Sequence, residues 1–126
     1  FTLIMLDIDH FKKINDNHGH LLGDSVLKEF VAVLSGNIRE CDTLARWGGE
    51  EFIILLPETT LEASLAMAEK LRSMIENNRF SCSECLTCSF GVTQFLPDDD
   101  MESLCKRVDE ALYEAKRNGR NTIVNK

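Results

Sequence analysis

Residues 43–56, TLARWGGEEFIILL, contain two strand-like runs on either side of a Gly-Gly pair. A Gly-Gly pair between apolar runs is a hairpin signal. The two glycines permit a positive φ in the turn, and they also let a phosphate approach the backbone. This stretch therefore predicts a β-hairpin whose second strand begins with Glu50 and Glu51.

The residues before the hairpin predict one strand and two helical segments. Residues 2–8 form a nearly continuous apolar run, which is typical of an interior strand with both faces covered. Residues 11–16 predict one or two helical turns, and Gly19 and Gly23 predict a loop after them. A helical apolar stripe then begins at Asp24, which is placed to cap that helix.

The residues after the hairpin predict two more helices and two more strands. Thr59 and Glu62 have the spacing of a capping box, and Gly91 interrupts the apolar run that follows the first of these helices. We expect a helix, a strand, a helix and a short strand, in that order, over residues 59–76, 86–95, 104–115 and 122–124.

The predicted element order is β, α, β, β, α, β, followed by α and β. The first six elements form a split βαβ arrangement, in which helices cover one face of an antiparallel sheet. The fold class expected is α+β, ferredoxin-like, with an antiparallel-rich sheet flanked by helices. We expect one domain over residues 1–126, which is trimmed at its N-terminus because no initiator Met or basic segment precedes the first strand.

The composition excludes several classes of protein. Hydrophobic residues make up 44% and charged residues 28% of the chain, which argues against disorder, collagen and coiled coil. The net charge of −7 argues against a broad DNA- or RNA-binding surface. No apolar run approaches the ~18–20 residues that a membrane span needs. The five cysteines, an odd count, favour reduced thiols and a cytoplasmic location.

Three carboxylates are expected to gather at one end of the sheet. Asp7 ends the first strand, and Glu50 and Glu51 begin the strand after the turn. Mg²⁺ prefers oxygen ligands, usually one or two carboxylates completed by phosphate and water. In a regular strand Glu50 and Glu51 point to opposite faces, so only one of them would face the site with Asp7. The alternative is an ordinary hairpin with solvated glutamates.

Several spaced motifs resemble the GGDEF domain of bacterial diguanylate cyclases. They cover the chain from residue 1 to about residue 124, and they are DIDHFKKIND at 7–16, GH at 19–20, GD at 23–24, GGEEF at 48–52, ALYEAK at 111–116 and GRN at 119–121. The resemblance implies a nucleotidyl-cyclase or polymerase palm. It also implies condensation of two GTP into cyclic di-GMP and two pyrophosphates, with two Mg²⁺ per site and Mn²⁺ as an alternative.

The same resemblance implies roles for individual residues. The metal ligands would be Asp7, the backbone carbonyl of Ile8, Glu50 and Glu51, and Glu50 would also help to deprotonate the attacking 3′-hydroxyl. Asn15 and Asp24 would hydrogen-bond the guanine. The remaining substrate-binding residues would be Phe11, which is also a core candidate, Lys12, His20, Gly48, Gly49, Lys116 and Arg120.

A product-binding site is expected outside the active site. Arg39 and Asp42 form an R-x-x-D pattern five residues before the Gly-Gly. This pattern resembles the inhibitory site of the family, where cyclic di-GMP binds. A second basic residue would come from the next helix, with Lys70 and Arg72 as candidates.

Other functions remain open on sequence grounds. The chain could be a catalytically weak module that binds GTP or cyclic di-GMP, or an enzyme acting on another nucleotide. For a cyclase, the resemblance implies a homodimer and an upstream sensor or regulatory domain, without membrane contact by this domain itself. Cys82, Cys85 and Cys88 have a C-x-x-C-x-x-C spacing that could indicate a metal site, but small hydrophobic packing residues are the favoured interpretation.

Overall fold

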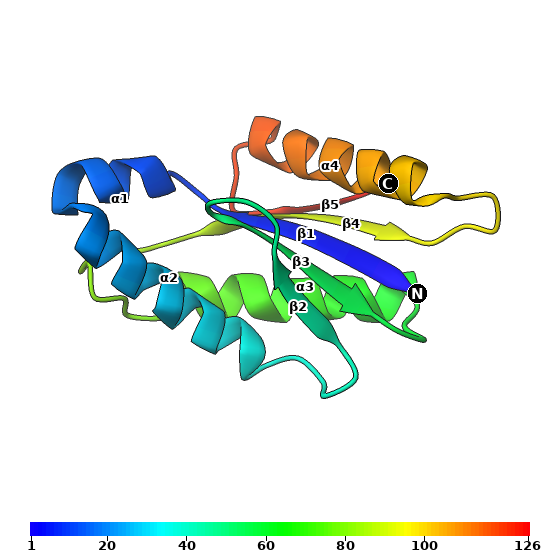
Figure 1. The fold of residues 1–126 in the computed structure, drawn as a ribbon, viewed down its shortest axis with the longest axis horizontal. Coiled ribbons are helices and arrows are strands. Elements are labelled where there is room, and N and C mark those ends of the chain that lie inside the picture. Colours follow the sequence, from blue (N-terminus) through cyan, green and yellow to red (C-terminus); the bar gives the residue numbers. More distant parts are fainter.

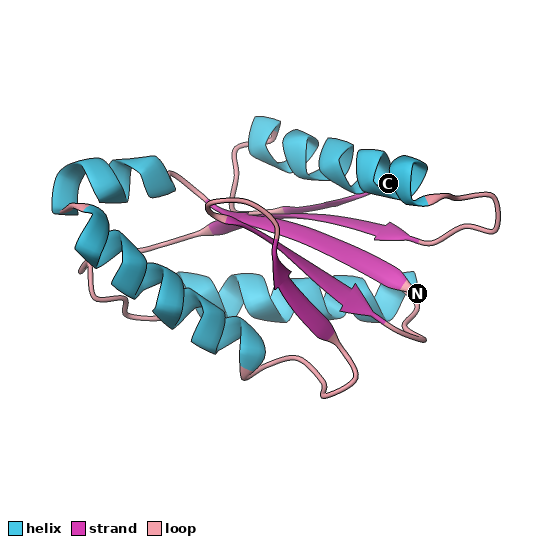
Figure 2. Cartoon of the chain, in the orientation of Figure 1, coloured by secondary structure: helices cyan, strands magenta, loops and turns pink.

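The computed structural model describes all residues, 1–126, as five strands and four helices (Figures 1 and 2). The strands are β1 (Thr2–Ile8), β2 (Thr43–Arg46), β3 (Glu51–Leu56), β4 (Cys88–Gln94) and β5 (Ile123–Asn125). The helices are α1 (Phe11–His18), α2 (His20–Ser35), α3 (Leu61–Asn77) and α4 (Met101–Arg117). None of these helices is both long and apolar enough to cross a bilayer.

The five strands form one sheet in the order β2-β3-β1-β4-β5. β1 lies at its centre and is antiparallel to both β3 and β4, while β5 adds to β4 in parallel. All seven residues of β1 are buried, as its continuous apolar sequence predicts. The predicted α+β fold with an antiparallel-rich sheet is confirmed.

Helices cover both faces of the sheet (Figure 1). On one face, the larger apolar core joins alternate residues of β1, including Ile4 and Leu6, to α1, α2 and α3. On the other face, Leu3 and Met5 pack with Ile53 and with the buried side of α4. Because strand side chains alternate between faces, Asp7 lies on the α4 side and Ile8 on the opposite side.

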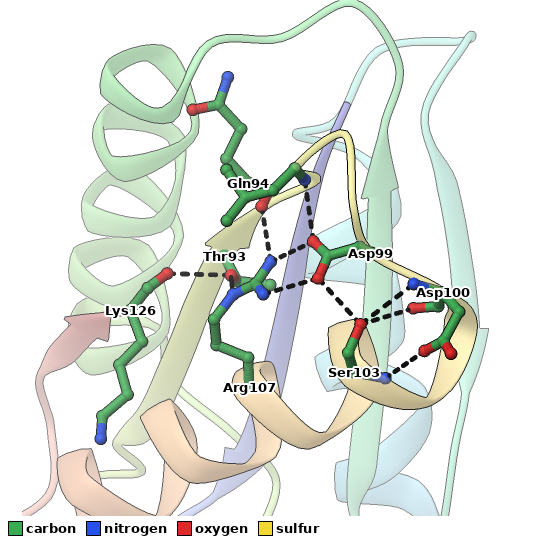
Figure 3. A network of polar contacts seen from close by, with 8 residues as sticks. Thr93, Gln94, Asp99, Asp100, Ser103, Arg107 and Lys126 are labelled. Atoms are coloured by element: carbon green, nitrogen blue, oxygen red, sulfur yellow. Dashed lines mark hydrogen bonds and ion pairs between the residues drawn. The ribbon is translucent and has the colours of Figure 1, made fainter.

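A polar network fixes the start of α4 against the sheet (Figure 3). Arg107 donates to the Asp99 carboxylate at 2.8 Å and to the Thr93 hydroxyl at 2.6 Å. Asp100 caps the helix by accepting from the Ser103 backbone N–H at 2.8 Å. These contacts tie the loop between β4 and α4 to the first half of the helix.

The structure corrects three local predictions for the helices and strands. α2 begins at His20, so Asp24 lies inside the helix and does not cap it. Thr60, and not Thr59, caps α3, because the Thr60 hydroxyl accepts from the Ala63 N–H at 3.2 Å. Gly91 does not interrupt its strand, since β4 pairs with β1 on both sides of it.

Candidate active site

The carboxylates meet where β1 ends beside the β2–β3 turn. Asp7 and Glu51 are directly paired across β1 and β3, which places both side chains on the α4 face of the sheet. Glu50 precedes β3, and it lines a cavity together with Asp7. In a regular strand Glu50 and Glu51 would point to opposite faces. Glu50 instead lies in the turn before β3, and from there it reaches the same site as Asp7.

Asp7 is a buried carboxylate with one free oxygen. Asp7 is 6% exposed, and its Oδ2 atom lies 2.5 Å from the Lys116 ammonium on α4. Its Oδ1 atom is buried and has no hydrogen-bond partner. Buried carboxylate oxygens without a partner are costly and uncommon. Such an oxygen is available to a ligand.

Burial also shifts the protonation of this carboxyl. It raises the pKa of Asp7 from 3.8 to about 6, against the opposing effect of Lys116, and the charges of Glu50 and Glu51 raise it further. Burial alone lowers the pKa of Lys116, but Asp7, Glu51 and Glu50 outweigh it and the net shift is upward. The site thus holds more negative charge than Lys116 neutralises.

The donor set fits a hard divalent cation. Three carboxylates surround one end of the sheet, and Asp7 Oδ1 is an unpaired acceptor. No three His, Cys, Asp or Glu side chains are already close enough to form a complete metal cage. Mg²⁺ needs only one or two carboxylates when phosphate oxygens and water complete its shell, so these residues suit a metal that arrives with a phosphorylated ligand.

Two adjoining cavities share the residues Phe11, Lys12 and Glu50. The smaller one, of ≈ 180 Å³, is also lined by Asp7, Ile8, Asp9, His10, Lys116 and Arg120. The larger one, of ≈ 400 Å³, is also lined by Asn15, His20, Asp24, Leu27, Arg46 and Gly49. The structure therefore brings cations and carboxylates into the small cavity and amide, imidazole and carboxylate groups into the large one.

Asn15 takes its place in the larger cavity because Gly23 lies directly behind it. A Cβ atom at position 23 would lie 1.9 Å from the Asn15 Oδ1 atom and 3.5 Å from the Phe11 ring. Gly23 is buried in the first half of α2 and is no helix breaker. The close contact between α1 and α2 at this glycine holds Asn15 in the wall of the cavity that Asp24 also lines.

The turn glycines have backbone angles that other residues also adopt. Neither Gly48 nor Gly49 has a positive φ, so the turn does not use the left-handed conformation that glycine permits. Gly49 lines the larger cavity, with nothing within 4 Å of the position that a Cβ would take, whereas Gly48 lines neither cavity. The open space at Gly49 agrees with the other expected use of a glycine, which is a close approach of ligand to backbone.

Arg46 and Asp9 are site residues that the sequence did not single out. Arg46 donates to the carbonyl oxygens of Gly48 and Gly49 at 3.1 Å, and it thereby fixes the turn. Asp9 lines the smaller cavity, and its buried carboxylate accepts hydrogen bonds from Thr87, from Ser89 in β4 and from the Asn121 N–H after α4. Arg46 precedes the Gly-Gly pair and Asp9 lies inside the first motif, but neither position indicates which groups the side chain contacts.

The R-x-x-D residues form a separate, ordered pair. Asp42 is buried and accepts from the Arg39 backbone N–H at 2.8 Å and from its guanidinium at 2.9 Å. Arg39 also donates to the Pro57 carbonyl at 3.1 Å. Arg72 points elsewhere, toward Glu69, Glu76 and Asn121, none of which contacts Arg39. Lys70, the other candidate, is exposed on α3.

The three spaced cysteines have different surroundings. Cys82 and Cys88 are buried in the larger apolar core, and Cys85 is exposed. The Cys88 thiol donates to the Asp7 carbonyl at 2.9 Å. All five cysteines are free thiols.

The chain matches the family model described as "Diguanylate cyclase, GGDEF domain" over residues 1–122. It is 47% identical over 124 residues to Diguanylate cyclase DgcP of Pseudomonas aeruginosa, an alignment that covers 96% of this chain and 18% of that protein. It is 42% identical over 131 residues to Response regulator PleD of Caulobacter vibrioides, with 99% of this chain and 29% of that protein covered. The chain thus spans less than a third of either relative.

Solved structures show the same fold. The GGDEF domain of DgcB from Caulobacter crescentus, solved in complex with c-di-GMP, matches with a TM-score of 0.93 and 33% identity over 98% of this chain and 76% of that one. The active GGEEF domain of a diguanylate cyclase from Vibrio cholerae matches with a TM-score of 0.91 and 38% identity, covering 98% of this chain and 81% of that one.

Proposed function

The chain belongs to the diguanylate cyclase GGDEF family, and we propose that it condenses two GTP molecules into cyclic di-GMP and two pyrophosphates. The observation that carries this proposal is the joining of the two cavities through Glu50. A cavity of ≈ 400 Å³ with hydrogen-bonding groups adjoins one of ≈ 180 Å³ that is lined by Asp7 and cations. This pairing suits a nucleotide whose base and phosphates bind in different surroundings.

The larger cavity would hold the guanine. Asn15 offers an amide that both donates and accepts, and Asp24 offers a carboxylate that accepts from the N1 and N2 hydrogens of guanine. His20 lies on the same wall, and the Phe11 ring supplies an apolar surface. These groups together favour guanine over adenine, which carries no hydrogen on N1.

The smaller cavity would hold the triphosphate. Lys12 and Arg120 bring positive charge to its wall, and Lys116 adds an ammonium that is paired with Asp7. Asp7, the Ile8 carbonyl, Glu50 and Glu51 would hold two Mg²⁺ or Mn²⁺ ions. When bound, such a pair of ions lowers the pKa of the attacking hydroxyl and neutralises the leaving pyrophosphate.

Glu50 would accept the proton of the 3′-hydroxyl; in support, it lines both cavities and so would lie between the base and the phosphates. Each cyclic di-GMP needs two such reactions, in which the 3′-hydroxyl of each GTP attacks the α-phosphate of the other. Two GTP-loaded copies of the domain would therefore face each other about a two-fold axis, as a homodimer under the control of an upstream regulatory domain.

The decisive experiment is incubation with GTP and Mg²⁺, followed by chromatography of the products over a range of protein concentrations. We expect cyclic di-GMP and pyrophosphate, with specific activity rising with concentration because two copies must meet. ATP under the same conditions is the control. A lack of cyclic di-GMP at the highest protein concentration would contradict the proposal and favour a nucleotide-binding module.

Gly23→Ala is expected to weaken GTP binding while leaving the fold intact. The new methyl group would overlap the Asn15 side chain, whose flexible end moves aside at little cost in stability. Losing the hydrogen bonds of Asn15 to guanine should raise KM by roughly 10- to 100-fold. Gly36→Ala, at the other end of α2 and outside both cavities, is the matched control. Equal KM values for the two variants would refute this role of Gly23.

We also propose that Arg39 and Asp42 bind cyclic di-GMP and mediate product inhibition. The buried Asp42 holds the Arg39 guanidinium in a fixed orientation, and Arg39 suits bidentate contact with phosphate or guanine. We favour Lys70 over Arg72 as the second basic residue, because Lys70 is exposed whereas Arg72 is engaged by Asn121.

Arg39→Ala should weaken cyclic di-GMP binding at this site by roughly 10- to 100-fold, the effect of losing a charge-assisted hydrogen bond. Calorimetric titration with cyclic di-GMP measures the affinity, and a GTP turnover assay with added product measures inhibition. Arg79→Ala removes an exposed arginine without hydrogen bonds and serves as the control. Unchanged affinity in Arg39→Ala would exclude this site.

A further inference from the structure

The segment that follows α4 has an unusual backbone. Gly119, Arg120 and Asn121 have φ angles of 103°, 65° and 47°, so three consecutive residues lie in the left-handed region. Glycine adopts this region freely and asparagine tolerates it, but arginine rarely does. For arginine this conformation is unfavourable, and it persists only where neighbouring contacts impose it.

Asp9 fixes the backbone of this segment. Its carboxylate accepts from the Asn121 N–H at 3.0 Å. It also accepts from the hydroxyl groups of Thr87 and Ser89, each at 2.7 Å. Asp9 is 6% exposed, and its three donors satisfy the buried charge. The carboxylate thus connects the end of β1 to β4 and to the segment after α4.

The side chain of Asn121 is fixed from the opposite direction, by α3. Arg72 donates to the Asn121 Oδ1 atom at 2.9 Å, and the Asn121 amide donates to the Glu76 carboxylate. Arg72 is itself held by Glu69, with hydrogen bonds of 2.8 and 2.6 Å. Both the backbone and the side chain of Asn121 are therefore bound to elements far away in the sequence.

Arg120 lies between Gly119 and this doubly fixed asparagine. It lines the smaller cavity with Asp7 and Lys116. Arg120 itself makes no side-chain hydrogen bond or ion pair in the structure, and only its backbone N–H is bound, to the Ala115 carbonyl at 3.1 Å. Its orientation therefore depends on the backbone of residues 119–121.

We infer that Asp9, Asn121 and Arg72 are positioning residues that hold the left-handed segment so that the Arg120 guanidinium faces the triphosphate. This inference rests on the proposed function, since it assigns Arg120 to the GTP phosphates. A role confined to anchoring β5 is the alternative, because Thr122, the next residue, accepts from the Phe90 N–H at 2.9 Å.

Asn121→Gly separates these two roles. Glycine accepts a φ of 47° without strain, so the segment remains able to fold while the contacts to Arg72 and Glu76 are lost. The probes are the GTP analogue guanosine 5′-(α,β-methylene)triphosphate with Mg²⁺, which keeps the phosphate charges, and guanosine, which has no phosphates. Calorimetry gives both affinities for the wild type, Asn121→Gly, Arg120→Ala and the double variant.

We expect Asn121→Gly and Arg120→Ala each to weaken analogue binding about tenfold, the effect of one charge-assisted hydrogen bond, and to leave guanosine binding unchanged. The double variant should bind the analogue no more weakly than Arg120→Ala, because both substitutions remove the same contact. Arg72→Ala, a change on α3 outside the cavity, should weaken the analogue in the same direction, while Arg79→Ala should not.

Other results would overturn the inference. Equal losses for analogue and guanosine, or additive losses in the double variant, would indicate a general structural role. If the wild type binds the analogue and Asn121→Gly binds it with the same affinity, the positioning role alone is overturned. A wild type that does not bind the analogue would overturn the proposed function, and this inference with it.

Discussion

Replacing Asp7 by asparagine is expected to reduce cyclic di-GMP synthesis by at least about 100-fold, because loss of a residue that merely supports a metal ligand already costs 10- to 100-fold. Asparagine keeps the shape of the side chain but loses the negative charge that would hold Mg²⁺. Product formation from GTP measures the effect. Asp98→Asn, an exposed substitution in the loop before α4, is the control and should keep full activity.

The same substitution should not destabilise the metal-free protein at neutral pH. The folded-state pKa of Asp7, about 6, lies above its ordinary value of 3.8. A raised pKa means that the folded protein binds the proton more tightly than the unfolded chain does, so protonation of Asp7 stabilises the folded state. This stabilisation is fully present below pH 4 and is lost as the pH rises to 6. Above pH 6 the buried charge opposes folding.

Chemical denaturation without divalent cations, at intervals from pH 4 to pH 7, tests this expectation. The loss of stability with rising pH should be smaller in Asp7→Asn than in the wild type, and at pH 7 the variant should be at least as stable. If Asp7→Asn is inactive and also unfolded at pH 7, then Asp7 is needed for folding. That result would contradict the view that Asp7 serves function and lowers stability.

Gly91→Ala is expected to give the largest loss of stability of any substitution considered. A Cβ atom there would lie 2.5 Å from the Leu112 nitrogen and 2.6 Å from the Val108 oxygen, which are backbone atoms of α4. Backbone cannot rotate away as a side chain does, so the whole helix must shift. Overpacking of this kind costs typically 1–3 kcal/mol and occasionally more, and we expect about 3 kcal/mol.

Urea denaturation measures this loss, and Gly49→Ala is its control. A Cβ at Gly49 meets nothing within 4 Å, and its φ is not positive, so its effect on stability should stay within about 0.5 kcal/mol. Gly91→Ala should also lower turnover, because displacement of α4 moves Lys116 away from Asp7. A Gly91→Ala variant as stable as the wild type would refute the close packing of β4 against α4.

The fold could be predicted because its signals are local. The alternation of apolar runs, the Gly-Gly turn and the helical periods each depend on neighbouring residues, and they give the element order of the structure except that α1 and α2 are two separate helices where the predicted order counts one. The convergence of Asp7 with Glu50 and Glu51 followed from that order, since strand ends that pair in a sheet meet at one edge.

The functions of two glycines could not be predicted in the same way. The sequence alone predicts a helix breaker at Gly23 and a strand interruption at Gly91, because glycine has a low intrinsic preference for helix and strand. Both are needed for the opposite reason: another element packs so closely that a side chain would collide with it. Close approach is a property of the folded chain, which a single sequence does not record.

The same limit applies to Asp9 and Arg46. Their roles come from hydrogen bonds to residues that are remote in sequence or lie in the backbone of a turn, such as the Asn121 N–H and the Gly49 carbonyl. Neither residue type specifies such a partner. The two residues therefore looked like ordinary charged positions until the tertiary structure gave them neighbours.

The division of the site between two layers has an evolutionary consequence. The groups proposed to recognise guanine stand on α1 and α2, whereas Asp7, Glu51 and Lys116 belong to the sheet and to α4 on its other face. Substitutions at Asn15 or Asp24 could change the preferred base without moving the metal ligands. The preference for a base and the metal-dependent reaction proposed for this domain could therefore evolve independently of each other.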